Sequence, residues 1–99
     1  MLAKILIKRH FKQEFTPEVI ELLHNLRGAA LTQPGYISGE TLTRPGDPCR
    51  MLVIGTWQSL DSWHQWQKNE RRRELDAELD ILLEEPATYE EYVVGWSKT

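Results

Sequence analysis

The middle of the chain predicts a β-hairpin in residues 36–57, YISGETLTRPGDPCRMLVIGTW. Its turn at 44–48, RPGDP, is dense in turn-forming residues, and strands are expected on either side at 36–43 and 50–57. Gly39 weakens the first of these strands. The second is apolar on both faces, with Met51, Val53 and Trp57 on one face and Leu52 and Ile54 on the other. We therefore place this strand in the interior of a sheet.

The segments on either side of the hairpin predict two further strands and the helices. Thr16 and Ser59 are cap residues that precede runs with helical spacing of apolar residues, and Pro86 ends the last of these runs. A kink is expected near 68–71, between two helical stripes. The elements expected outside the hairpin are a strand at 2–11, a helix at 17–31, a helix through about residue 69, a helical stripe at 71–84 and a strand at 88–96.

This order of elements predicts an α+β fold. Right-handed crossovers on an antiparallel sheet give the ferredoxin-like βαββαβ arrangement, a four-stranded antiparallel sheet with the strands at 2–11 and 50–57 in its centre. A chain of 99 residues has room for one domain, residues 1–99. Two helices cover only one face of such a sheet, and the other face carries Leu2, Leu6, Leu52 and Ile54. We expect a second copy of the chain to bury that face, giving a homodimer.

Composition narrows the function classes. Twelve Lys and Arg against fifteen Asp and Glu give a net charge of −3, which supplies no electrostatic basis for binding nucleic acid or an anionic membrane. Cys49 is the only cysteine, so neither a disulfide nor a thiolate zinc site is expected within one chain. No apolar run is long enough to cross a membrane, and Lys4 and Lys8 interrupt any signal-peptide core. We expect a cytoplasmic protein.

Three segments together resemble the antibiotic biosynthesis monooxygenase family. They are GYISGETLTRP at 35–45, MLVIGTW at 51–57 and the Trp-rich helix that follows, and the resemblance extends over roughly residues 2–95. It implies the dimeric α/β-barrel fold, in which two such sheets pack together. It also implies a choice among activities: cofactor-independent oxygenases that act on quinols or polycyclic phenols, oxygenases that degrade haem, and members with no known reaction.

The haem-degrading alternative is disfavoured by the residues present. The resemblance to that branch implies a tryptophan on the helix after the third strand. When the two are aligned on TWQS at 56–59, this tryptophan falls on Trp66. Its first-strand asparagine and its histidine iron ligand fall near Ile7 and on Asp76, and a carboxylate is a poor replacement for the imidazole. The chain has no glycine-rich nucleotide motif and no histidine spacing typical of metal sites. We expect no cofactor and no metal.

Five residues are candidates for a site that binds a small aromatic substrate. Trp66 and His64 are the catalytic candidates, because an indole can stack on a flat ring and donate a hydrogen bond, while an imidazole can accept a phenolic proton. Tyr36, Trp63 and Tyr92 are candidates for substrate binding. The structural alternatives are helix packing for Trp66, core packing for Trp63, burial as core residues for the tyrosines and a surface position for His64.

Two other groups of polar residues are expected to face solvent. Lys68, Arg71, Arg72 and Arg73 are interleaved with acids, and Arg72 stands four residues before Asp76, which predicts a solvated helix face with an ion pair. His24 is expected at the solvent side or the edge of the first helix.

The function predicted is a cofactor-independent monooxygenase that acts on a quinol or polycyclic phenol. The alternative is a non-catalytic, dimeric module that binds a small ligand or serves in stress.

Overall fold

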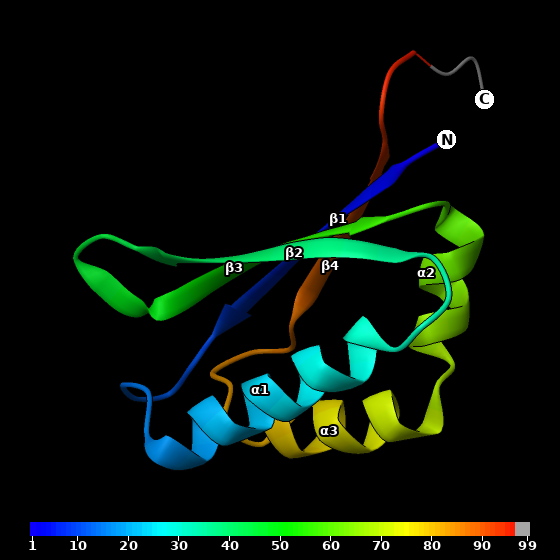
Figure 1. Cartoon of the computed structure of the whole chain (residues 1–99). Helices are drawn as coiled ribbons and strands as arrows, with labels where there is room; N and C mark the ends of the chain where they lie inside the picture. The colour runs from blue at the N-terminus through cyan, green and yellow to red at the C-terminus, as the bar shows by residue number, and fades with distance from the viewer. Residues whose placement is uncertain (97–99) are drawn as a thin grey trace.

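The computed structural model describes residues 1–96 and has the predicted architecture (Figure 1). A single antiparallel sheet has the strand order β2-β3-β1-β4, so the first and third strands are central, as expected. The ferredoxin-like βαββαβ order is confirmed, with the second helical region divided in two. The elements are β1 (Ala3–His10), α1 (Pro17–Leu31), β2 (Tyr36–Arg44), β3 (Asp47–Trp57), α2 (Leu60–Gln67), α3 (Glu70–Asp80) and β4 (Thr88–Val93).

All three helices lie on one side of the sheet (Figure 1). On β1, the residues that point toward them are Ala3, Ile5, Ile7 and Arg9, all of which are buried. Alternate residues point the other way, where no part of residues 1–96 forms a second layer. None of the helices in this part of the chain is long and apolar enough to cross a membrane.

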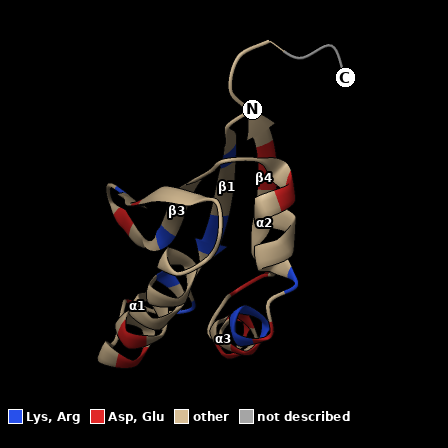
Figure 2. Cartoon of the chain, turned by 45° about the vertical axis from the view of Figure 1, so that its right-hand side comes forward, with Lys and Arg blue, Asp and Glu red and all other residues tan. Residues whose placement is uncertain are grey.

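Side-chain caps fix where the helices begin. The Thr16 hydroxyl accepts a hydrogen bond from the Val19 amide, at 3.3 Å, and Ser59 accepts one from the Ser62 amide, at 3.1 Å. The expected kink is present as a complete break, because α2 ends at Gln67 and Asn69 then caps α3. The break turns α3 away from α2 and brings it against α1 (Figures 1 and 2).

Three boundaries differ from the sequence-based expectation. The hairpin turn is tighter, because Arg44 pairs with Asp47 and only Pro45 and Gly46 lie between the strands. Gly46 has φ +79°, and a proline followed by a residue with positive φ is the pattern of a type II turn. The expected helix at 71–84 ends at Asp80, and the strand expected at 88–96 is paired only over Thr88–Val93.

The outer face of the sheet carries a group of leucine and isoleucine side chains on β1, β2 and β3. Leu6 stands opposite Ile54, and Leu52 stands opposite both Lys8 and Leu42, so these side chains form one surface. Leu42 is exposed, and Leu6, Leu52 and Ile54 are half-buried. We call this surface, formed by Leu6, Leu42, Leu52 and Ile54, the outer patch.

Candidate functional site

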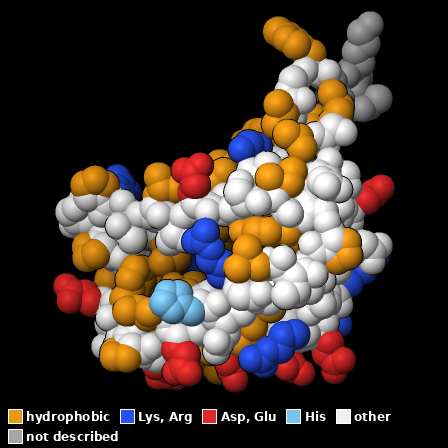
Figure 3. Space-filling view, viewed as in Figure 1, with side chains coloured by type: hydrophobic (Ala, Val, Ile, Leu, Met, Phe, Trp, Pro, Cys, Tyr) orange, Lys and Arg blue, Asp and Glu red, His pale blue; other side chains and the backbone are white. Residues whose placement is uncertain are grey.

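A cavity of about 340 Å³ separates the helices from the inner face of the sheet. Its mouth lies between α1 and β2, where the lining residues Ile20, His24, Arg27 and Thr41 are exposed. Figure 3 shows hydrophobic side chains gathered on the face of the molecule below the sheet and above α1. The Arg27 guanidinium crosses this opening and donates to the Gly39 carbonyl oxygen at 3.1 Å. The cavity is thus open to solvent on the α1–β2 side.

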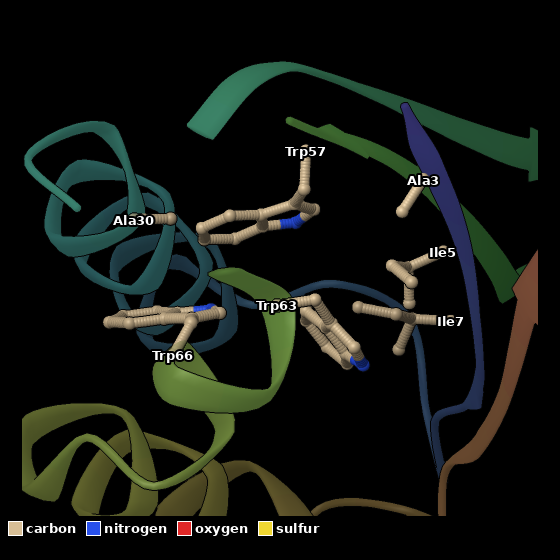
Figure 4. Close-up of a cluster of buried hydrophobic side chains, with 7 residues drawn as sticks. All are labelled: Ala3, Ile5, Ile7, Ala30, Trp57, Trp63 and Trp66. Atoms are coloured by element: carbon tan, nitrogen blue, oxygen red, sulfur yellow. The ribbon is translucent and has the colours of Figure 1, made fainter. Parts of the chain in front are cut away.

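Three tryptophans form one end of the cavity. Trp57 comes from the end of β3, and Trp63 and Trp66 come from α2; each is at most 4% exposed. The rings of Trp57 and Trp66 lie 6.4 Å apart between centroids and 28° from parallel, and Trp63 is tilted against Trp57 at 6.0 Å. Figure 4 shows the near-parallel pair, with Ala30 beside it. The tryptophans are therefore core residues and cavity walls at the same time.

The indole N–H groups of the two α2 tryptophans differ in their partners. Trp63 Nε1 donates to Glu91 Oε2 at 3.0 Å, so its ring is fixed from β4. Trp66 Nε1 makes no hydrogen bond within residues 1–96. In the same residues, every side-chain nitrogen or oxygen that is fully buried has a hydrogen-bond partner, so Trp66 Nε1 is not fully buried. The Trp66 N–H therefore borders accessible space, and Trp66 lines the cavity. It is available to donate to a ligand.

Tyr36 completes the aromatic wall from the first residue of β2. Its ring meets Trp57 edge to face, with centroids 5.1 Å apart and an interplanar angle of 82°. The Tyr36 hydroxyl lies over Gly39, where a Cβ atom would stand only 2.6 Å from the oxygen. The glycine that weakens β2 in sequence terms thus makes room for a cavity-lining tyrosine.

Two buried arginines and one carboxylate lie beneath the aromatic wall. Arg72 Nη2 is 3.0 Å from Asp76 Oδ2, and Arg9 Nη2 is 3.3 Å from Asp76 Oδ1. Arg72 also donates to the Tyr89 hydroxyl at 3.2 Å, and its guanidinium carbon stands 5.1 Å from the Trp63 ring centroid. Both arginine side chains line the cavity and are less than 10% exposed. We call Arg9, Arg72 and Asp76 the arginine cluster.

The arginine cluster corrects the expectation that the basic residues of α3 all face solvent. The predicted Arg72–Asp76 pair is present, but Arg72 does not lie on a solvated face. Arg71 on the same helix is exposed, as expected, and Figure 2 shows basic and acidic residues mixed on α3. Asp76, which falls on the iron-ligand position of the haem-degrading branch, is held by the two guanidiniums. In residues 1–96 no group of three or more His, Cys, Asp or Glu side chains is arranged to hold a metal ion.

The structure brings three of the five candidate residues to the cavity and leaves two outside. Tyr36, Trp63 and Trp66 line it. His64 points toward β4, where its Nε2 lies 3.0 Å from Glu91 Oε2, because one residue along a helix turns the side chain by 100° from Trp63. Tyr92 pairs with Lys4 on β1, whose side chain faces away from the helices, and it is 51% exposed with its hydroxyl donating to Glu90.

The sequence reasoning missed two groups that line the cavity. Arg9 occupies an inward position in the same alternation that gave Ala3, Ile5 and Ile7, so period-two spacing was the available signal. His24 follows Ile20 by four residues on α1, which places both on the cavity side of that helix. From the sequence, His24 is expected at the solvent side or the edge of its helix, and Arg9 is given no role.

The family model for antibiotic biosynthesis monooxygenase matches residues 3–77, from β1 into α3. The chain belongs to this family. The match covers the cavity walls from β1, α1, β2, β3 and α2, together with the whole arginine cluster. No curated protein sequence matches the chain significantly.

Solved structures share the fold at low sequence identity. A conserved protein from Methanosarcina mazei Go1 is 18% identical, with a TM-score of 0.85 over 93% of this chain and 91% of that one. SnoaB, a cofactor-independent oxygenase from Streptomyces nogalater, is 10% identical, with a TM-score of 0.84 over 98% of this chain and 96% of its own. A protein from Mycobacterium tuberculosis is also 10% identical, with a TM-score of 0.83 over the full length of both chains. These three solved structures share the architecture of this chain.

Proposed function

We propose that this protein is a cofactor-independent monooxygenase that oxidises a quinol or polycyclic phenol with molecular oxygen. The observation that carries the proposal is the cavity itself, which is walled by Trp57, Trp63, Trp66 and Tyr36 in a member of the antibiotic biosynthesis monooxygenase family. Flat aromatic walls favour a flat aromatic ligand, because stacked and edge-to-face ring contacts add to the burial of apolar area. The similarity in fold to SnoaB, itself a cofactor-independent oxygenase, is consistent with this activity.

The substrate supplies the electrons in such a reaction. Removal of the phenolic proton makes the ring electron-rich, and a ring carbon then bonds to one atom of oxygen. The second oxygen atom leaves as water, whose two hydrogens come from that ring carbon and from the hydroxyl, and a quinone remains. The protein's contribution is to orient the ring, accept the proton and stabilise the anion.

Each role has a residue at the cavity. The Trp66 N–H is available to donate to a substrate oxygen. His24, at the mouth, is the histidine that lines the cavity, and imidazole is the commonest general base in proteins. His64 acts from outside as a positioning residue, because it shares the Glu91 carboxylate that fixes the Trp63 ring.

A homodimer is part of the proposal. The outer patch is apolar, and no layer of residues 1–96 covers it. A second copy of the chain would bury the patch and form the dimeric α/β barrel implied by the family resemblance.

Oxygen uptake by the purified protein, without added cofactor, tests the activity. A panel of quinols and polycyclic phenols should include one that is consumed faster than its own autoxidation. Trp66→Phe keeps an aromatic ring but removes the N–H, and it should lower turnover. Trp96→Phe is the matched control, because Trp96 is 99% exposed beyond β4. Ligand binding without any uptake would instead favour the non-catalytic binding module, an alternative supported by the position of His64 outside the cavity.

A further inference from the structure

We propose that the arginine cluster is an anion-binding subsite, and that the ligand of this cavity is an aromatic anion whose carboxylate or phenolate oxygen is bound by Arg9 and Arg72. The inference rests on the proposed function only in taking the cavity as the ligand site. It adds the charge of the ligand and the position of its anionic end.

The charged residues that line the cavity are of one sign. They are Arg9, Arg27 and Arg72, and within the described chain no aspartate or glutamate lines it. This is unlike the protein as a whole, which carries three more acidic than basic side chains. A concave, largely apolar site lined by a single sign of charge attracts ligands of the opposite sign.

The arginine cluster is not internally neutral. Arg9 and Arg72 contribute two positive charges, and Asp76 contributes one negative charge that they share through its two oxygens. The Arg72 contacts with Tyr89 and Trp63 orient the guanidinium but add no negative charge. A buried net positive charge is costly unless a further anion compensates it, so the cluster is arranged to accept one.

Arg9 also has unused donors. A guanidinium has five N–H groups, and among the partners in residues 1–96 only Asp76 is bonded to Arg9, through Nη2. Because no fully buried side-chain nitrogen in residues 1–96 lacks a partner, the other Arg9 nitrogens border open space. Arg9 lines the cavity, so these donors can form the paired hydrogen bonds that guanidinium makes to a carboxylate or phenolate.

The cavity has an aromatic part and a positively charged part. Trp57 and Trp66 present their rings on the α2 side, and the arginine cluster lies at the α3 side beside Trp63. A ligand that occupies both parts of the cavity combines an aromatic ring with an anionic oxygen.

Binding of 1-naphthoate and 1-naphthamide, followed by quenching of tryptophan fluorescence, tests the inference without any turnover. The two compounds have nearly the same shape and differ in charge. We expect 1-naphthoate to bind the wild-type protein about tenfold more tightly or better, since hydrogen bonds to charged groups are the strong ones. Equal affinity for the two compounds would overturn the inference.

Two arginine variants locate the subsite. Arg9→Met should abolish the preference for 1-naphthoate, and it leaves Arg72 and Asp76 as a balanced pair. Arg71→Met is the matched control. It removes one arginine charge, as Arg9→Met does, but from an exposed position on α3 outside the cavity. A preference that survives in Arg9→Met, or that disappears equally in both variants, would contradict the proposed position. If Arg9→Met does not fold, Arg9→Gln provides the same test, since glutamine removes the charge and keeps a side-chain N–H donor.

A third compound separates the two sources of an anionic oxygen. The affinity for 1-naphthol is measured while the pH is raised through its ionisation. Tighter binding as the phenolate forms assigns the subsite to phenolates, while a flat profile beside tight 1-naphthoate binding assigns it to carboxylates. Because oxygen consumption plays no part, preference for the anion without oxygen uptake would refute the monooxygenase and leave the subsite standing. Oxygen uptake without preference for the anion would do the reverse.

Discussion

Asp76 is the residue on which the buried charges of this protein depend. Its carboxylate is the shared partner of Arg9 and Arg72, at 3.3 and 3.0 Å, and all three side chains are largely buried. Asp76→Asn keeps the size of the side chain and one acceptor oxygen but removes the negative charge. Two guanidiniums would then lie near each other with no carboxylate between them.

The size of the effect follows from burial. Removing one partner of a buried ion pair costs about 3 to 5 kcal/mol, because the other charge is left uncompensated. The Asp76 side chain is 15% exposed, and asparagine still offers one acceptor, so we take the lower end. We expect the free energy of unfolding to fall by about 3 kcal/mol, which corresponds to roughly 12 to 24 °C in Tm for a domain of this size.

A double-mutant cycle shows whether the two arginines repel each other. Arg9→Met alone leaves a balanced Arg72–Asp76 pair and should cost much less than Asp76→Asn. In the Arg9→Met background, Asp76→Asn leaves one uncompensated guanidinium instead of two, so its cost should be smaller than in the wild type by about 1 kcal/mol. Urea unfolding of the four proteins, followed by tryptophan fluorescence and circular dichroism, measures each value.

Two results would refute this reasoning. A loss of less than about 1 kcal/mol in Asp76→Asn would mean that solvent already compensates the guanidiniums, at the level typical of surface pairs. An equal cost of Asp76→Asn in both backgrounds would mean that Arg9 and Arg72 do not share this carboxylate. Either result would also remove the net positive charge on which the anion-binding subsite rests.

The outer face of the sheet provides two further predictions. Leu52→Asp places a charge in the outer patch and should convert a dimer into a monomer, as measured by light scattering. The same change at Leu31, which is exposed on α1, is the control and should leave the assembly unaltered. A Leu52→Asp variant that remains dimeric would contradict the assignment of the interface. Hydrogen bonds from Lys8 and then Tyr92 lower the pKa of Glu90, so the folded state favours its carboxylate. This contribution to stability is present above the ordinary pKa of a glutamate and is lost as the pH falls through the lowered value. A carbon-detected NMR titration should find that lowered pKa, and Lys8→Met should raise it; an unchanged pKa in that variant would show that Lys8 does not act on Glu90.

Local patterns determined the elements and their order. Alternation in residues 2–11, the caps Thr16 and Ser59, and the turn at 44–48 each depend on neighbours within a few positions, so the sequence is sufficient to predict them. The break between α2 and α3 was also predictable, although Asp80 as the end of α3 was not. A helix can end wherever tertiary contacts favour a turn, and the pattern of leucines continued beyond that point.

The aromatic part of the site was also largely encoded locally. Trp63 and Trp66 stand three positions apart, which keeps both on one side of α2, and Trp57 ends the inward row of β3. Tyr36 and Tyr92 were equivalent by sequence, since each lies on a strand. Pairing decided between them, because Tyr92 stands opposite Lys4 in the register of β1 and β4 and so faces outward.

The charged part of the site was decided by tertiary structure alone. Periodicity gives the direction of a side chain relative to its own element, but it does not say whether that direction leads to solvent or to another element. Arg72 would be a surface residue on an isolated helix, and the break after Gln67 turns α3 so that this side chain meets Trp63, Tyr89 and Asp76 beside the inner face of the sheet. Arg9 joins it from β1, 63 positions earlier in the sequence, because only the packed sheet and helices bring the two guanidiniums to one carboxylate.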